Sequence, residues 1–116
     1  MVAVLIVLIA ALHGYILWLE MFRWEAPRTR AAFGMTEEQA AATRVLAANQ
    51  GLYNGFLAAG LLWAAFAGAE NGFTLRLFFL GCVLVAGIYG GLTVTRRILF
   101  IQALPAAIVL ALVVLS

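Results

Sequence analysis

Residues 45–60 read VLAANQGLYNGFLAAG, and the interpretation of the whole chain depends on this stretch. It belongs to a long apolar run, yet it contains four polar side chains and two glycines: Asn49, Gln50, Gly51, Tyr53, Asn54 and Gly55. On the surface of a soluble helix such residues would be ordinary. In hydrocarbon every unsatisfied polar group is costly, so there they would require partners.

The composition indicates which solvent surrounds this stretch. The chain has 116 residues, of which 66% are hydrophobic and 10% charged, and its mean hydropathy is +1.10. A soluble domain of this size could not hide so much apolar surface. A membrane helix needs about 20 mostly apolar residues, and four segments qualify: Val2–Phe22, Arg44–Phe66, Leu75–Thr95 and Ile98–Leu115. The expected fold is all-α, a polytopic membrane protein with a four-transmembrane-helix bundle.

A capping box predicts where the second helix begins. In this motif the Thr36 side chain accepts a hydrogen bond from an early backbone N–H, while Gln39 reaches back to the N–H of Thr36. The helix therefore starts at Glu37, before it enters the membrane. The expected single domain, 1–116, has helices at about 2–22, 37–67, 75–95 and 98–115 and an interfacial cytoplasmic loop at 23–36.

The arginines predict the orientation. Six of the seven basic residues fall in the first and third loops, which lie on one side of a four-helix bundle: Arg23, Arg28, Arg30, Arg44, Arg96 and Arg97. Only Arg76 falls at the second loop. Basic loops stay in the cytoplasm, so both termini are expected on the outer side. The predicted location is a bacterial cytoplasmic (inner) membrane.

The polar residues of the quoted stretch share one sector of the helix. With Gln50 at zero, Asn54 lies at about +40°, Tyr53 at about −60° and Asn49 at about −100°. Gly51 and Gly55 lie on the flank at about +100° and +140°. This sorting predicts a polar face turned inward and a glycine face against a neighbouring helix.

Other helices place polar groups at a similar depth in the cytoplasmic half. His13 and Glu20 are seven residues apart on the first helix, so they share a face about 10 Å apart along the axis. The prediction is one polar cavity that binds a ligand through ten residues: His13, Glu20, Asn49, Gln50, Tyr53, Asn54, Tyr89, Thr93, Arg96 and Gln102.

Several of these residues also have a structural explanation. Amide side chains often hydrogen-bond between membrane helices, at about 0.6 to 2 kcal/mol each. Glu20 could extend to the interface and pair with Arg23 or Arg44. The two GxxxG spacings, Gly51–Gly55 and Gly87–Gly91, indicate close packing within the subunit or in a homo-oligomer. His13 is a functional candidate because ionisable groups deep in membranes are rare, and packing is its alternative.

Several kinds of site are not expected. One histidine and one cysteine, Cys82, on different helices do not make a metal site, and no phosphate loop or cofactor motif is present. The expected partners are membrane lipids and a lipophilic small molecule, with no nucleic acid.

The chain resembles a known family through two motifs. The first is Glu20-Met21-Phe22-x-Trp24-x-x-Pro27-Arg28-x-x-x-x-Phe33-Gly34, and the second runs from Asn49 to Gly60 as NQGLYNGFLAAG. These are similar to a family of small integral membrane proteins of bacteria and fungi known only as a domain of unknown function. The resemblance implies a four-helix membrane protein of this length. It does not imply any particular activity.

Four functions remain open. The favoured one is the binding or carriage of a small amphipathic or lipid-like molecule, since converging polar groups in an apolar pocket form the usual ligand site. The second is a cofactor-independent intramembrane isomerase in which His13 and Glu20 are the catalytic acid–base pair; sterol isomerases offer an analogy without a motif match. The third is a proton-coupled small transporter, although Glu20 lies near a helix end. The fourth is a structural subunit.

Overall fold

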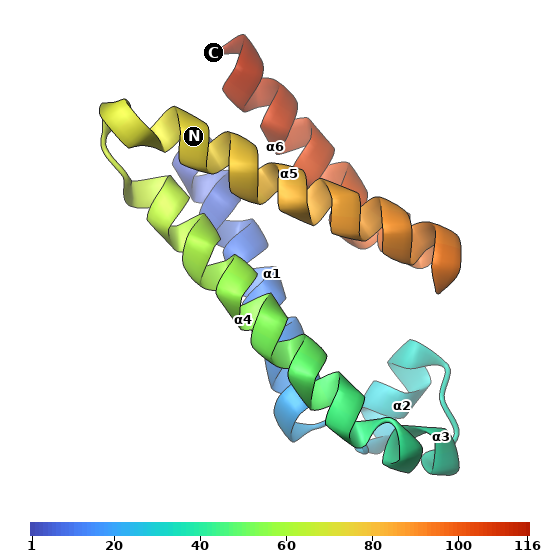
Figure 1. The fold of residues 1–116 in the computed structure, drawn as a ribbon. Helices are drawn as coiled ribbons and strands as arrows, with labels where there is room; N and C mark the ends of the chain where they lie inside the picture. The colour runs from blue at the N-terminus through green and yellow to red at the C-terminus, as the bar shows by residue number, and fades with distance from the viewer. The chain divides into compact units, whose positions relative to one another are not determined.

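The structure, a computed structural model, describes residues 1–116, and all of its regular secondary structure is helical (Figure 1). Its six α-helices and one π-helix follow the order α1 (Val2–Phe22), α2 (Pro27–Phe33), α3 (Glu37–Ala42), α4 (Arg44–Phe66), α5 (Ala69–Thr93), η1 (Leu99–Ala103) and α6 (Leu104–Leu115). There are no strands, so the predicted all-α class is confirmed.

The helices form two compact units. The first unit comprises Met1–Ala10 and Leu57–Ser116, and the second comprises Ala11–Phe56. The long helices α1 and α4 contribute one half to each unit. The single domain expected from the sequence stays a prediction.

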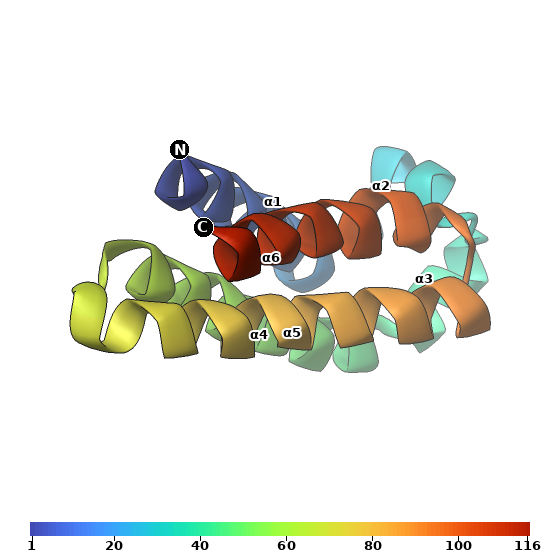
Figure 2. The ribbon, with the colours of Figure 1, turned by 90° about the horizontal axis from the view of Figure 1, so that it is seen from above.

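Small residues allow close packing in the first unit. Figure 2 shows α5 and α6 running side by side. A Cβ at Gly87 would lie 2.6 Å from the backbone nitrogen of Ala103, so no larger residue fits without moving a helix. Gly91 similarly packs under Leu99, and Gly60 under the ring of Phe79. The apolar core around these contacts comprises Ile6, Ile9, Ala10, Leu61, Ala65, Leu80, Val83, Ala106, Val109 and Val113.

An arginine caps the carboxyl end of α4. Arg76 donates from Nε to the carbonyl of Ala64 and from Nη2 to the carbonyl of Ala65, each at 3.1 Å. The last carbonyls of a helix have no partner within the helix and carry partial negative charge, so a guanidinium satisfies both needs. This contact fixes the first turns of α5 to the end of α4.

Proline explains the π-helix at the start of the last segment. Pro105 has no N–H, so the regular hydrogen-bond pattern cannot continue through it. The N–H of Leu104 instead reaches back to the carbonyl of Leu99, which widens the turn. The sequence predicts one helix over 98–115, and the structure divides it into η1 and α6.

The predicted loop 23–36 contains a helix, which corrects that part of the sequence analysis. Pro27 occupies the first turn of α2, where its missing N–H costs nothing. Gly34 ends α2 at φ 67°, and its N–H bonds to the carbonyl of Arg30. This left-handed conformation favours glycine. Hydropathy alone could not reveal α2 because the helix is short and contains both charged and apolar residues.

The capping box is confirmed, but the predicted helix 37–67 is interrupted. Thr36 Oγ1 accepts from the N–H of Gln39 at 3.1 Å, and the Gln39 side chain accepts from the N–H of Thr36 at 2.9 Å. Seven residues after Thr36, Thr43 leaves helical geometry, with φ −105° and ψ 8°. Its hydroxyl donates to the carbonyl of Gln39 at 2.7 Å, a local bond that competes with regular helix geometry.

Two helices are long and apolar enough to cross a membrane, α1 and α5. The apolar stretch Leu99–Leu115 is shorter, and the polar residues of α4 lower its hydropathy. The two long helices are consistent with membrane association, and the four-span bundle stays a prediction. α5 begins at Ala69 rather than at 75, because the extended Gly68 and the acidic Glu70 suit a helix start.

Candidate functional site

The second unit buries three of the predicted site residues. His13 is fully buried, and Glu20 and Asn54 expose only 7% and 8% of their surfaces. His13 and Glu20 lie on the same side of α1, as their spacing requires. No fully buried side-chain nitrogen or oxygen in the protein lacks a hydrogen-bond partner.

A hydrogen bond joins Glu20 to Asn54 across 34 residues of sequence. Asn54 Nδ2 donates to Glu20 Oε1 at 2.6 Å. The same nitrogen donates to the backbone carbonyl of Gln50 at 3.3 Å. The amide therefore connects the end of α1 to the middle of α4, and the second bond orients it along α4.

Two glycines allow α1 and α4 to approach closely enough for this bond. A Cβ at Gly51 would lie 2.6 Å from Met21 Cγ, 3.1 Å from Glu20 Cβ and 3.3 Å from the carbonyl oxygen of Leu17. A Cβ at Gly55 would lie 2.7 Å from Leu17 Cδ1. The glycine face of α4 thus packs against a helix of the same chain, which is one of the two arrangements that the GxxxG spacing indicates.

Glu20 does not form the ion pair considered in the sequence analysis. Within the second unit its side chain contacts Asn54, and neither Arg23 nor Arg44 neutralises it. Buried acidic groups are almost always paired, because an isolated carboxylate loses its hydration without compensation. A buried carboxyl group held only by a neutral amide is thus a candidate site for recognising another molecule.

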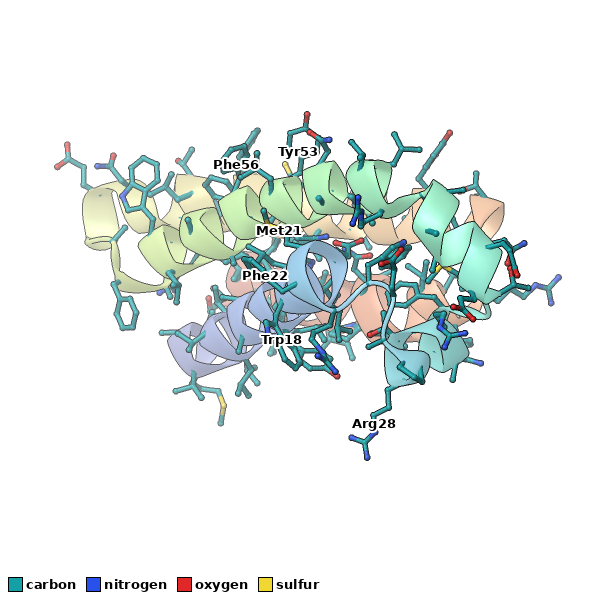
Figure 3. The ribbon with its side chains drawn as sticks, turned by 90° about the horizontal axis from the view of Figure 1, so that it is seen from below. Trp18, Met21, Phe22, Arg28, Tyr53 and Phe56 are labelled. Carbon is teal, nitrogen blue, oxygen red and sulfur yellow. The ribbon has the colours of Figure 1, made fainter.

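The other polar residues of α4 point away from this contact. Asn49, Gln50 and Tyr53 are exposed, and Asn49 bonds its own helix through the carbonyl of Val45 at 2.9 Å. Figure 3 shows Tyr53 and Phe56 projecting from the side of α4 that faces away from α1. The packed face of α4 is centred on the glycines rather than on the polar sector, and only Asn54 lies near enough to the glycines to turn inward.

The remaining predicted residues belong to the first unit. Tyr89, Thr93 and Arg96 are exposed, and Thr93 donates to the carbonyl of Tyr89 within α5. Gln102 lies half-buried in the π-helix and has a partner. Two surface hollows are found in this unit, one near Arg76 and one between α5 and α6, and none of the ten predicted residues lines either hollow. The shared cavity stays a prediction.

The glycines of α5 contact residues of the same chain. Gly87 and Gly91 pack against Ala103 and Leu99. The homo-oligomer expected through glycine faces stays a prediction.

Sequence reasoning missed a connection that supports the Glu20 end of α1. Trp24 Nε1 donates to Thr43 Oγ1 at 3.0 Å, and the Trp24 ring packs against Phe33 with centroids 5.0 Å apart. The link fixes the segment after α1 to the start of α4. Trp24 belongs to the loop 23–36, which was expected to lie at the interface, and the sequence analysis named no partner for it.

The fold and this site define an all-α protein with long apolar helices and a buried carboxyl–amide pair. Its sequence matches the family described as proteins of unknown function (DUF1304) over residues 7–114, and the chain belongs to that family. A relative from Lactococcus lactis subsp. lactis (strain IL1403), named "Uncharacterized protein YpaA", is 34% identical over 101 residues, which cover 85% of this chain and 84% of the relative. No solved structure matches the chain.

The residues that carry the resemblance to the family gather largely in the second unit. Glu20 and Asn54 form the buried pair, Trp24 and Phe33 pack together, and Gly34 ends α2. Arg28 projects away from the ribbon (Figure 3) and is exposed. The first motif and the start of the second thus build one local structure around the end of α1 and the start of α4.

Proposed function

We propose that the chain is an integral membrane protein that crosses the bilayer four times, with both termini on the outer side of the cytoplasmic membrane. The distribution of residue sizes supports this. Many buried positions are alanine or glycine, whereas large apolar residues such as Phe56, Trp63 and Phe78 are more than half exposed. Small residues at helix contacts and large apolar residues outside are typical of membrane helices.

The arginines support the orientation. Six lie either between the end of α1 and the first residue of α4 or just before η1, on the side proposed to be cytoplasmic. The exception, Arg76, has a structural role because it caps two carbonyls of α4. The position of Arg76 is thus explained by packing. The six other arginines, whose distribution predicts the topology, all lie on one proposed side of the membrane.

Cysteine labelling tests this topology. With Cys82 replaced by serine, single cysteines are introduced at Arg28 and Ser116 and treated with a membrane-impermeant maleimide on intact cells. The cysteine at 116 should react, and the cysteine at 28 should react only after permeabilisation. The reverse pattern would contradict the proposed orientation.

We propose that the protein binds or carries a small amphipathic or lipid-like molecule, through a polar cavity organised around Glu20 and Asn54 in the cytoplasmic half of the membrane. The observation that carries this proposal is the buried carboxyl group whose partner is a neutral amide. Ionisable groups at such positions usually mark substrate or ion pathways. Glu20 lies two residues before the end of α1, so a molecule could reach it from the headgroup region while its apolar part stays in the bilayer.

The proposed site lies within the second unit. His13 lies seven residues before Glu20 on the same side of α1 and is fully buried. It would lie toward the apolar end of the bound molecule.

Native mass spectrometry with extraction of co-purifying molecules tests the binding. Wild type is compared with Glu20→Gln, which keeps the size of the side chain and removes its charge. Glu25→Gln is the matched control, because Glu25 is exposed in the same unit. A species retained by wild type and the control but lost from Glu20→Gln supports binding at this site. Equal retention by all three, or no specific species, would indicate that the pair only packs α1 against α4.

A further inference from the structure

The hydrogen-bond donors at the buried pair are already used. Asn54 carries two N–H hydrogens on Nδ2, and it has two acceptors, Glu20 Oε1 and the carbonyl of Gln50. Both neighbours are oxygens, so the amide must turn its nitrogen toward them. No N–H of Asn54 remains for a ligand.

Two acceptor oxygens are left at the same place. Glu20 Oε2 and Asn54 Oδ1 receive no hydrogen bond from the protein, and they belong to side chains more than nine-tenths buried. No fully enclosed side-chain oxygen is without a partner, so both oxygens keep some exposed surface. The site therefore provides hydrogen-bond acceptors, and a ligand that fits it must carry hydrogen-bond donors.

We propose that the group held by Glu20 and Asn54 is a primary ammonium at the head of an amphipathic molecule. This inference rests on the binding function proposed above and names the chemical class of its ligand. A primary ammonium brings N–H donors and a positive charge, which match two acceptor oxygens, one of which belongs to a carboxylate. A carboxylate or phosphate head would bring only acceptors and a repelling charge. A trimethylammonium head would bring the charge without any N–H donor.

Three amphiphiles with the same apolar chain separate these alternatives. The protein is placed in nanodiscs of phosphatidylcholine at pH 7 and titrated with dodecylammonium, dodecyltrimethylammonium or dodecanoate. Binding is followed through the side-chain amide resonance of Asn54, which reports on the site itself. Glu20→Gln is titrated alongside, with Glu25→Gln as the matched control.

The expected result is that dodecylammonium shifts the Asn54 resonance saturably in wild type and in Glu25→Gln. It should bind at least about tenfold more tightly than the other two probes, a difference of about 1.4 kcal/mol. Glu20→Gln should weaken it by a similar factor. The comparison of probes on wild type does not depend on the variant folding.

Equal binding of dodecyltrimethylammonium or dodecanoate overturns the inference, as does the absence of any Asn54 shift with dodecylammonium. The mass spectrometry above then decides separately whether a molecule of another class is bound. If the inference holds, a second set of nanodiscs containing phosphatidylethanolamine identifies the source of the ammonium. A shift caused by that lipid alone assigns a membrane lipid, and no shift assigns a free amine.

Discussion

Replacing Gly51 by alanine should separate α1 from α4 and weaken the Glu20–Asn54 contact. The added Cβ would lie 3.1 Å from Glu20 Cβ and 3.3 Å from the carbonyl oxygen of Leu17, whereas carbon contacts are comfortable at about 3.5–4.0 Å. The Met21 side chain, 2.6 Å away, can rotate. The contacts with Glu20 Cβ and the Leu17 carbonyl oxygen involve atoms that are fixed to the backbone of α1. One of the two helices must therefore move by several tenths of an ångström.

The magnitude follows from three contributions. Overpacking of a tight contact costs about 1–3 kcal/mol. Lengthening the 2.6 Å bond between Asn54 and Glu20 costs about 1–2 kcal/mol more if it breaks. Alanine returns up to about 1 kcal/mol, since glycine is the poorer helix former. The free energy of unfolding should therefore fall by about 2 kcal/mol.

Reversible unfolding in detergent micelles, followed by tryptophan fluorescence, measures this loss. Gly14→Ala is the matched control, because nothing lies within 4 Å of a Cβ at Gly14 in the same unit. It should be neutral or stabilise the protein slightly. If Gly51→Ala were as stable as Gly14→Ala and left the Asn54 side-chain amide resonance unchanged, the close approach of α1 and α4 would be refuted.

Three further substitutions test other contacts. Thr43→Val removes the acceptor for Trp24 and should cost about 1 kcal/mol, with a shift of the indole N–H resonance that Thr43→Ser does not cause; an unchanged resonance would argue against the bond. Gly87→Ala forces a Cβ against the backbone of Ala103 and should lower stability by about 1–3 kcal/mol in thermal unfolding, so a gain in stability would contradict that packing. Arg76→Gln exposes two carbonyls of α4 and should speed hydrogen exchange in its last turn, while unchanged exchange would mean that the cap contributes nothing.

Local signals in the sequence predicted much of the secondary structure. The capping box at Thr36 set the start of α3 because both of its hydrogen bonds lie within four residues. The end of α1 and the extent of α4 agree with the hydropathy. α2 and the break at Thr43 were missed, since they depend on short polar segments and on the contact with Trp24 rather than on a repeated apolar pattern.

The candidate site was predicted only in part because helix spacing defines a face without naming its partner. The spacing places His13 and Glu20 on one face of α1, and both side chains are buried. The polar sector of α4 was taken as the inward face, whereas Gly51 and Gly55 determine which side packs against α1. Small residues permit the closest approach, so the packed face follows them, and Asn54 is inward because it lies beside them. The pairing with Glu20 depends on the register of two helices, which a single sequence does not contain.

The measurement that tests the central claim most directly is site-specific photocrosslinking in living cells. Arg23 follows Glu20 by three residues and is exposed, so it can be replaced by benzoylphenylalanine with little disturbance. Phe78, 61% exposed on α5, is the control position. The account predicts that position 23 captures a distinct small amphipathic molecule, that position 78 does not, and that Glu20→Gln abolishes the capture. The same mixture of bulk lipids at both positions, unchanged by Glu20→Gln, would contradict it.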